Sequence, residues 1–179
     1  MFIATSLDGF IARRDGSLDW LPGGDGQPAD PDAPSDGDYG YASFLASVDA
    51  LLMGRATYDA VLGFGEWPYG TKPVVVLTTR DLVQPVDPSA VVSASSGRAA
   101  DVARRLVDEG RPRVYLDGGR TIQQFLAAGL VGRLVITRIP VLLGDGIPLF
   151  GPLPSDVVLR HEATESFTSG LVQSTYRID

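Results

Sequence analysis

The 179-residue sequence predicts an α/β fold with a mostly parallel central sheet, flanking helices and a C-terminal antiparallel hairpin. Short, continuous apolar runs alternate with segments of helical spacing, a rhythm typical of parallel strands that helices cover on both faces. Glycines follow several of these runs, and two β-rich segments separated by turn residues close the chain. A chain of this length can build one well-buried core, so we expect a single domain over residues 1–179.

The N-terminal segment predicts a first, central strand with a break. Phe2–Ser6 is apolar and β-compatible, and the Asp8-Gly9 turn interrupts it before Phe10–Ala12. Residues 13–37 are rich in Gly, Pro and Asp, which defeats any regular pattern. A loop of that length is usually a lid, a binding loop or disordered, and we leave these alternatives open for residues 23–37.

Further strands are expected where apolar runs continue, at Ala50–Met53, Pro73–Leu77, Val91-Val92, Val114–Leu116 and Leu134–Val141. Helices are expected around residues 41–48, 56–62, 99–110 and 122–129, where apolar residues recur at helical spacing. Asp36 or Asp38 is available to cap the first helix, and Ser95 or Ser96 the third. Residues 157–164 and 172–178 predict the closing antiparallel pair.

The composition excludes several classes of protein. The chain has no cysteine and one histidine, which rules out disulfides, a thiol nucleophile and zinc sites built on thiolates or several histidines. A net charge of -7 argues against binding nucleic acid, which needs clustered positive charge. We find neither a signal peptide nor an apolar run long enough to cross a bilayer, so we expect a cytoplasmic protein that binds no membrane.

Three strand ends carry residues suited to binding an anion: Gly54-Arg55-Ala56-Thr57, Thr78-Thr79-Arg80 and Asp117-Gly118-Gly119-Arg120-Thr121. Ligands of open α/β sheets collect at the carboxyl ends of the strands. There, helix N-termini offer amide groups and the positive end of the helix dipole, and glycine lets the main chain approach a pyrophosphate closely.

Each junction alone has a plainer explanation as an ordinary turn or a solvated strand end. Together they bring hydroxyls and guanidinium groups to one edge, which is the chemistry required by a dinucleotide with an extra ribose phosphate. Arg55 and Arg80 are the candidates for that phosphate. We therefore expect a dinucleotide that carries this extra phosphate to bind more tightly than one that lacks it.

The sequence offers fewer candidates for catalytic residues than for residues that bind the dinucleotide. Asp38 could orient or protonate a heterocycle, and its position before a helix fits a capping role equally well. Trp20 and Trp67 could line a pocket or simply cover core. His161 falls in the expected hairpin, where a surface or partly packed role is the better interpretation.

Several motifs now form a recognisable set. The opening Ala4-Thr5-Ser6-Leu7-Asp8-Gly9-Phe10-Ile11-Ala12 resembles that of the reductase domain of riboflavin biosynthesis, the RibD C-terminal domain, which shares the dihydrofolate reductase fold. Similar motifs follow in the same order at residues 52–58, 76–80, 118–120 and 140–150. The resemblance covers nearly the whole chain, and it implies a dihydrofolate reductase-like fold for the single domain.

The resemblance also implies roles for individual residues. Ile11 and Ala12 would flank the nicotinamide of NADPH, while Gly54, Arg55 and Thr57 would hold phosphates. The adenosine ribose phosphate would contact Leu77, Thr78, Thr79 and Arg80. The pyrophosphate would be held by Gly118, Gly119, Arg120, Thr121 and Ile122, and Asp117 directly before them would be a further cofactor-binding residue. Asp38 would take the role of the catalytic carboxylate of dihydrofolate reductase, with Thr137 as its partner on the substrate side.

We therefore expect an NADPH-dependent reductase that transfers hydride to a C=N bond, or to an opened ribose carbonyl, of a pteridine- or pyrimidine-like substrate. Phe10 stands where the riboflavin enzymes usually carry a lysine, and no zinc-binding deaminase segment is present, so we expect a stand-alone relative with a changed substrate. The family resemblance implies a homodimer. The alternative is a dinucleotide-binding module without turnover, acting as a sensor or interaction partner.

Overall fold

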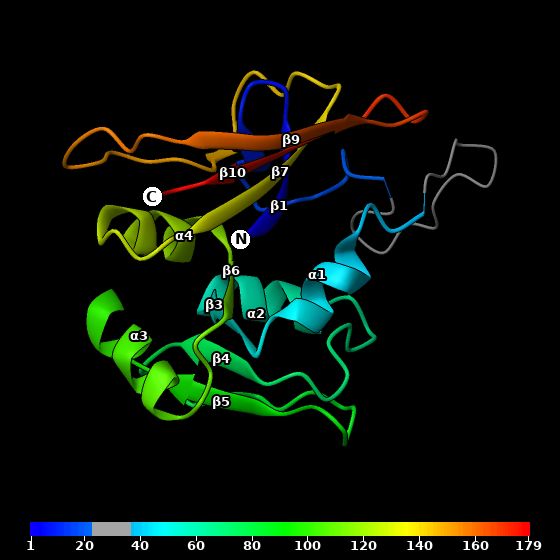
Figure 1. Cartoon of the computed structure of the whole chain (residues 1–179). Coiled ribbons are helices and arrows are strands. Elements are labelled where there is room, and N and C mark those ends of the chain that lie inside the picture. The colour runs from blue at the N-terminus through cyan, green and yellow to red at the C-terminus, as the bar shows by residue number, and fades with distance from the viewer. Residues whose placement is uncertain (23–36) are drawn as a thin grey trace. The chain divides into compact units, whose positions relative to one another are not determined.

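The computed structural model describes residues 1–22 and 37–179. Of the expected loop at 23–37, only Gly37 is among the described residues, and the expected cap by Asp36 lies outside them. The chain forms two compact units. We call Ala42–Leu130 the middle unit, and Met1–Tyr41 together with Val131–Asp179 the terminal unit (Figure 1). The expectation of one domain over residues 1–179 stays a prediction.

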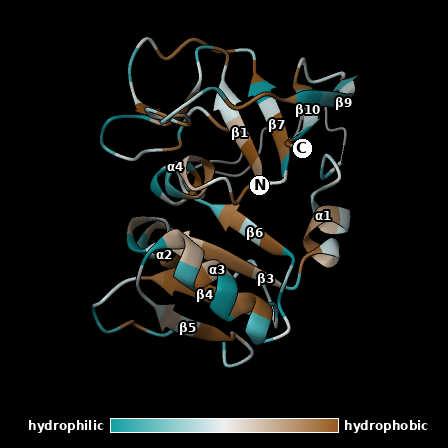
Figure 2. Cartoon of the chain, turned by 60° about the vertical axis from the view of Figure 1, so that its left-hand side comes forward, coloured by the Kyte–Doolittle hydropathy of each residue, from teal (hydrophilic) through white to brown (hydrophobic). Residues whose placement is uncertain are grey.

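The middle unit contains a four-stranded parallel sheet in the order β5-β4-β3-β6. Its strands are β3 (Ala50–Gly54), β4 (Val74–Leu77), β5 (Val92–Ser95) and β6 (Val114–Asp117). Residues 50–53 of β3 are fully buried, and β3 and β4 are hydrophobic along their length in Figure 2. Burial on both faces explains why these strands read as continuous apolar runs, and the predicted parallel sheet is confirmed.

The described residues form four helices: α1 (Tyr41–Ser47), α2 (Arg55–Leu62), α3 (Ala99–Asp108) and α4 (Gly119–Ala127). The expected cap of α3 by Ser95 or Ser96 is wrong, because Ser95 ends β5 and the N-cap is Arg98. The Arg98 backbone is extended, and its carbonyl oxygen accepts the amides of Asp101 and Val102. The main chain therefore starts this helix without a side-chain cap.

The terminal unit contains a four-stranded sheet in the order β1-β7-β10-β9. Its strands are β1 (Phe2–Ser6), β7 (Arg133–Ile139), β10 (Val172–Arg177) and β9 (Arg160–Ser166). β1 runs parallel to β7, and the other pairs are antiparallel. The expected C-terminal hairpin is confirmed.

β1 lies at the end of its sheet rather than at the centre, contrary to our expectation. Within the described residues it pairs only with β7, and the segment after the Asp8-Gly9 turn leaves this sheet altogether. That segment, β2 (Phe10–Ala12), pairs with β8 (Ile147–Pro148). Among the described residues, no helix is long and apolar enough to span a membrane.

Candidate functional site

The structure brings the three predicted junctions to one edge of the middle unit's sheet. β3, β4 and β6 are parallel, with Gly54 opposite Leu77 and Met53 opposite Asp117. Because parallel strands present their carboxyl ends at the same edge, the segments that follow them begin side by side. The fourth strand, β5, adds a junction that the sequence reasoning missed, with Ser95 opposite Leu77.

Two helix N-termini at this edge pack against each other through reciprocal contacts. A Cβ atom on Gly118, the N-cap of α4, would lie 2.2 Å from Thr57 Oγ1 of α2. A Cβ on Gly54, the N-cap of α2, would lie 3.3 Å from Thr121 Oγ1 of α4. Each glycine thus makes room for a threonine of the opposite helix, and the two helices begin at nearly the same place.

This arrangement offers main-chain charge to a ligand. Among the described residues, no side chain caps the N-terminus of α2 or α4. The first amide groups of a helix lack intrahelical acceptors, and the dipole places partial positive charge there. Two adjoining N-termini without side-chain caps can therefore stabilise an anion that carries more than one charge.

Asp117 lies at the end of β6, and its Oδ1 accepts the amide of Gly118 at 2.8 Å. Burial raises the pKa of the Asp117 carboxyl above its ordinary 3.8, against the opposing effect of that hydrogen bond. Asp117 therefore places its carboxyl group next to the N-terminus of α4, with Oδ1 bonded to the Gly118 amide.

Arg55 is held mainly by contacts within the protein. Its Nε donates to Asp59 Oδ1 at 2.7 Å and its Nη1 to the carbonyl oxygen of Asp81 at 2.8 Å. The Asp59 bond lies within α2, and the Nη1 bond connects α2 to the segment that follows β4. The expected role of Arg55 on the ribose phosphate stays a prediction, but its Nη1 donor holds the loop next to Arg80. The Arg80 side chain, in contrast, makes no ion pair within the described part of the chain.

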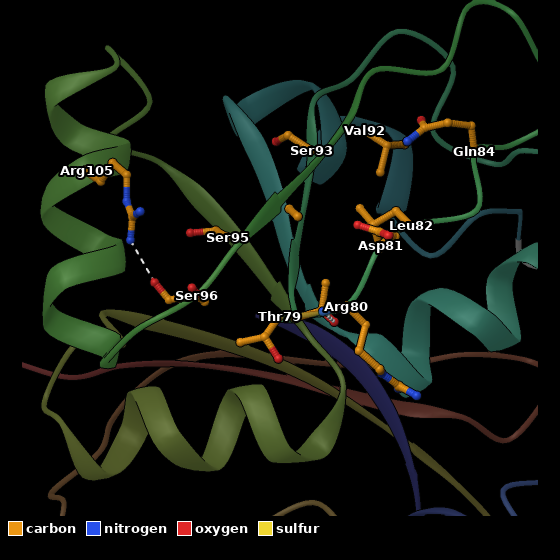
Figure 3. Close-up of a pocket in the computed structure, with 12 residues that line it drawn as sticks. Thr79, Arg80, Asp81, Leu82, Gln84, Val92, Ser93, Ser95, Ser96 and Arg105 are labelled. Carbon is orange, nitrogen blue, oxygen red and sulfur yellow. Dashed lines mark hydrogen bonds between the residues drawn. The ribbon is translucent and has the colours of Figure 1, made fainter.

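A hollow of about 530 Å³ lies beside the ends of β4 and β5. Polar and charged residues dominate its lining, among them Thr78, Thr79, Arg80, Ser95, Ser96 and Arg105. Figure 3 shows Arg105, on α3, and Arg80 at opposite sides of it, with Ser95 and Ser96 between them. Arg105 donates through Nη2 to the carbonyl oxygen of Ser96 at 2.9 Å. The sequence reasoning treated the two serines as helix caps and missed Arg105, although the position of the serines after a strand was the available signal.

The predicted nicotinamide residues lie in the terminal unit. Ile11 is partly exposed and Ala12 is buried, both on β2. Phe10 packs against Gly146, where a Cβ would lie 3.2 Å from the Phe10 side chain and 2.4 Å from the Ala12 carbonyl oxygen. Phe10, which stands at the position of the lysine noted above for the riboflavin enzymes, is therefore an uncharged ring packed on a turn.

Asp8 attaches the turn before β2 to a distant loop. Its carboxylate accepts the Ser6 hydroxyl at 2.6 Å and the amides of Leu143 and Gly144 at 3.2 and 2.7 Å. The Ser6 hydrogen bond, aided by the two amides, lowers the pKa of the Asp8 carboxyl below its ordinary 3.8. Ionised Asp8 thus fixes the approach to Ile11 and Ala12.

The Asp8→Asn variant is expected to be less stable than the parent at neutral pH, because an amide accepts these hydrogen bonds less well. A carboxyl with a lowered folded-state pKa contributes stability above its unfolded pKa, and that contribution is lost as the pH falls through the folded value. The stability difference between parent and variant should therefore shrink below about pH 4. Urea denaturation of both proteins from pH 7 to pH 3 measures it, and a difference independent of pH would contradict this assignment.

Asp38 and Thr137, the predicted catalytic pair, are connected in the structure by a residue that the sequence reasoning missed. Asp38 is exposed in the turn before α1, where its carboxylate accepts the amide of Gly40 at 3.1 Å. Thr137 is buried on β7. Gln173 of β10 donates through Nε2 to Thr137 Oγ1 at 3.0 Å and to the carbonyl oxygen of Tyr39 at 3.1 Å. A lone glutamine in a hairpin strand carried no signal in the sequence.

The remaining aromatic candidates, Trp67, Trp20 and His161, lie in different surroundings. Trp67 packs edge-on against Tyr58 and Tyr69 and donates to the Gly70 carbonyl oxygen, so it covers core. Within the described residues the buried Trp20 Nε1 has no acceptor, which suits a residue facing a ligand or water. His161 is exposed on β9, beside Thr164 and Tyr176, as expected.

Comparisons with known proteins agree on a family. The model of the RibD C-terminal domain matches residues 1–173. The uncharacterized protein YwjB of Bacillus subtilis (strain 168) is 35% identical over 169 residues, which cover 93% of this chain and 90% of YwjB. The crystal structure of the "Putative riboflavin biosynthesis protein" from Shewanella sp. PV-4 has 42% identity and a TM-score of 0.86, covering 99% of this chain and 97% of its own.

A more distant solved structure bears on the fold alone. The dihydrofolate reductase from Enterococcus faecalis, in complex with NADP(H), has 17% identity and a TM-score of 0.60. The match covers 99% of this chain and 94% of that enzyme. The dihydrofolate reductase-like fold implied by the sequence motifs is thereby confirmed.

Proposed function

Because the chain belongs to the RibD C-terminal domain family, we propose that it is an NADPH-dependent reductase acting on a pyrimidine- or pteridine-like heterocycle. The observation that carries the proposal is the pair of adjoining helix N-termini in the middle unit, held together by the Gly54–Thr121 and Gly118–Thr57 contacts. Such a site favours a pyrophosphate, the central group of a dinucleotide.

We assign the adenosine end to the hollow beside β4 and β5. Its threonine and serine hydroxyls can bond ribose, and Arg80 can bond an additional phosphate through its guanidinium group. Arg105 contributes a second positive charge across the hollow, with one donor already engaged by Ser96. These features favour NADPH over NADH.

The terminal unit supplies the substrate side of the proposal. When bound, a reduced nicotinamide supplies the hydride, and the protein supplies placement and a proton. Asp38, or a water that it orients, would protonate the nitrogen of the C=N bond, and Thr137 would bond the heterocycle. The uncharged Phe10 at the usual lysine position favours a substrate without the phosphoribosyl group of riboflavin biosynthesis.

The test is oxidation of NADPH, followed by its absorbance, with pterins, folates and aminopyrimidines as acceptors. We expect binding of NADPH and steady turnover with at least one of these heterocycles. Binding without any turnover would favour the alternative of a non-catalytic dinucleotide-binding module. The absence of affinity for any nicotinamide nucleotide would contradict both.

A further inference from the structure

We infer that Gln173 is a positioning residue that holds the Asp38 turn and the Thr137 hydroxyl in one fixed arrangement. The inference rests on the proposed reductase function, in which these two residues serve the substrate. It also adds a property of that substrate, because it determines which hydrogen-bonding role Thr137 can play. All the residues concerned belong to the terminal unit.

The register of the sheet places Gln173 for this task. Gln173 of β10 stands directly opposite Thr137 of β7 in an antiparallel pair, so their side chains leave the same face of the sheet. Its Nε2 lies 3.0 Å from Thr137 Oγ1 and 3.1 Å from the carbonyl oxygen of Tyr39, the residue after Asp38. One amide group therefore connects a buried strand to an exposed turn.

The Tyr39 contact determines the orientation of the amide. A carbonyl oxygen can only accept a hydrogen bond, so the NH₂ group of Gln173, and not its oxygen, must face Tyr39. The same NH₂ group faces Thr137, whose hydroxyl must then accept. The Thr137 hydroxyl proton remains to be donated, and within the described residues its side chain makes no other hydrogen bond. Thr137 is thus a donor to a ligand, and the substrate must present an acceptor there, such as a ring nitrogen or a carbonyl oxygen.

We call the two hydrogen bonds of Gln173, to Thr137 and to the Tyr39 carbonyl oxygen, the clamp. The backbone of the turn gives an independent reason for it. Tyr39 has a φ of 53°, the only positive φ of a non-glycine residue in the described part of the chain. Such a conformation persists only where the surroundings hold it, and it occurs often at functional sites. Here the Tyr39 ring packs edge-on against Phe167 at 4.9 Å, and Gln173 bonds the Tyr39 carbonyl. Loss of the Gln173 donor would let the turn relax and Asp38 move with it.

The first experiment tests the clamp without relying on activity. Gln173→Met keeps the length of the side chain and removes its donor. We expect hydrogen exchange of the Gly40 and Tyr41 amides, which bond Asp38 in the turn, to accelerate about tenfold. Gln124→Met makes the same change at an exposed position on α4 and should leave that exchange unaltered. Unchanged exchange in a folded Gln173→Met protein overturns the inference.

The second experiment tests the consequence for catalysis. Gln173→Met should lower kcat about tenfold or more while the Kd for NADPH stays within about twofold, because no proposed phosphate contact lies in the terminal unit. Gln173→Glu cannot donate when ionised but can donate one hydrogen bond when protonated. Its kcat relative to that of Gln173→Met should therefore rise as the pH falls. Equal losses of kcat and NADPH affinity, or no pH-dependent recovery, would overturn the positioning role.

The two proposals fail in different ways. If the parent protein turns over no heterocycle, the proposed function fails, while the exchange measurement still decides whether Gln173 holds the turn. If the parent is an active reductase and exchange is unchanged in Gln173→Met, the clamp fails and the proposed function stands.

Discussion

Replacing Gly118 with alanine is expected to lower the free energy of unfolding by roughly 2–5 kcal/mol and to abolish NADPH binding. Gly118 has φ +81° and ψ 136°, a backbone region that residues with a side chain rarely adopt. An added Cβ would also meet Thr57 Oγ1 at 2.2 Å, far inside the contact distance. The backbone strain and the overlap with Thr57 act together, and both disturb the close packing of the start of α4 against α2.

Denaturation with urea and titration with NADPH measure the two effects of this change. Gly129→Ala is the matched control, because Gly129 also has a positive φ, +67°, but nothing lies within 4 Å of its missing Cβ. It should lose only about 1 kcal/mol and keep NADPH binding. Adding Thr57→Ala to Gly118→Ala should recover the part of the loss due to overlap, which a double-mutant cycle isolates.

An equal, small loss in the Gly118→Ala and Gly129→Ala proteins would show that the reciprocal packing of α2 and α4 is not tight. Normal NADPH binding by a folded Gly118→Ala protein would contradict the assignment of the pyrophosphate to this edge. The two measurements are independent, since a protein can lose stability and still bind its ligand.

Arg80→Ala is expected to weaken NADPH binding about tenfold and to leave NADH binding nearly unchanged. A hydrogen bond to a charged group contributes about 1.5–3 kcal/mol, and exposure of Arg80 to solvent argues for the lower end of that range. The effect should shrink at high salt, because screening weakens exposed charge pairs. Fluorescence titration with both nucleotides, at low and high ionic strength, measures it.

Substitutions of two further arginines on α3 show how much each positive charge contributes to NADPH affinity. Arg105→Ala should show a smaller loss of NADPH affinity than Arg80→Ala, because Arg105 already donates to the Ser96 carbonyl. Arg104→Ala is the control, since Arg104 is paired with Asp101 and does not line the hollow. If the parent protein bound NADPH and NADH equally, or if Arg80→Ala weakened both alike, the assignment of the ribose phosphate would be wrong.

The strand ends show how far sequence reasoning reached. Gly54, Leu77 and Asp117 were expected at one edge because buried apolar runs predict parallel strands, and parallel strands align their carboxyl ends. The same reasoning failed for β1, which lies at the end of its sheet, and for the start of α3, where the main chain of Arg98 replaced the expected serine cap. The failure for β1 had no local signal, because strand order is set by pairing between distant segments. For α3 a local signal was available, since the two serines come at the end of a strand.

Local pattern was sufficient for whatever depends on neighbouring residues: the parallel β3–β6 sheet, the C-terminal hairpin, and the glycines and arginines that follow the strands. The partners of those residues were decided only in three dimensions. The contact between Gly118 and Thr57, the bracing of Arg55 by Asp59 and Asp81, and the bridge from Gln173 to Thr137 and Tyr39 depend on register and close packing. Hydrophobic periodicity reports which face of a single helix or strand is buried. A hydrogen bond between residues 39 and 173, in contrast, forms only after the strands between them have paired in register.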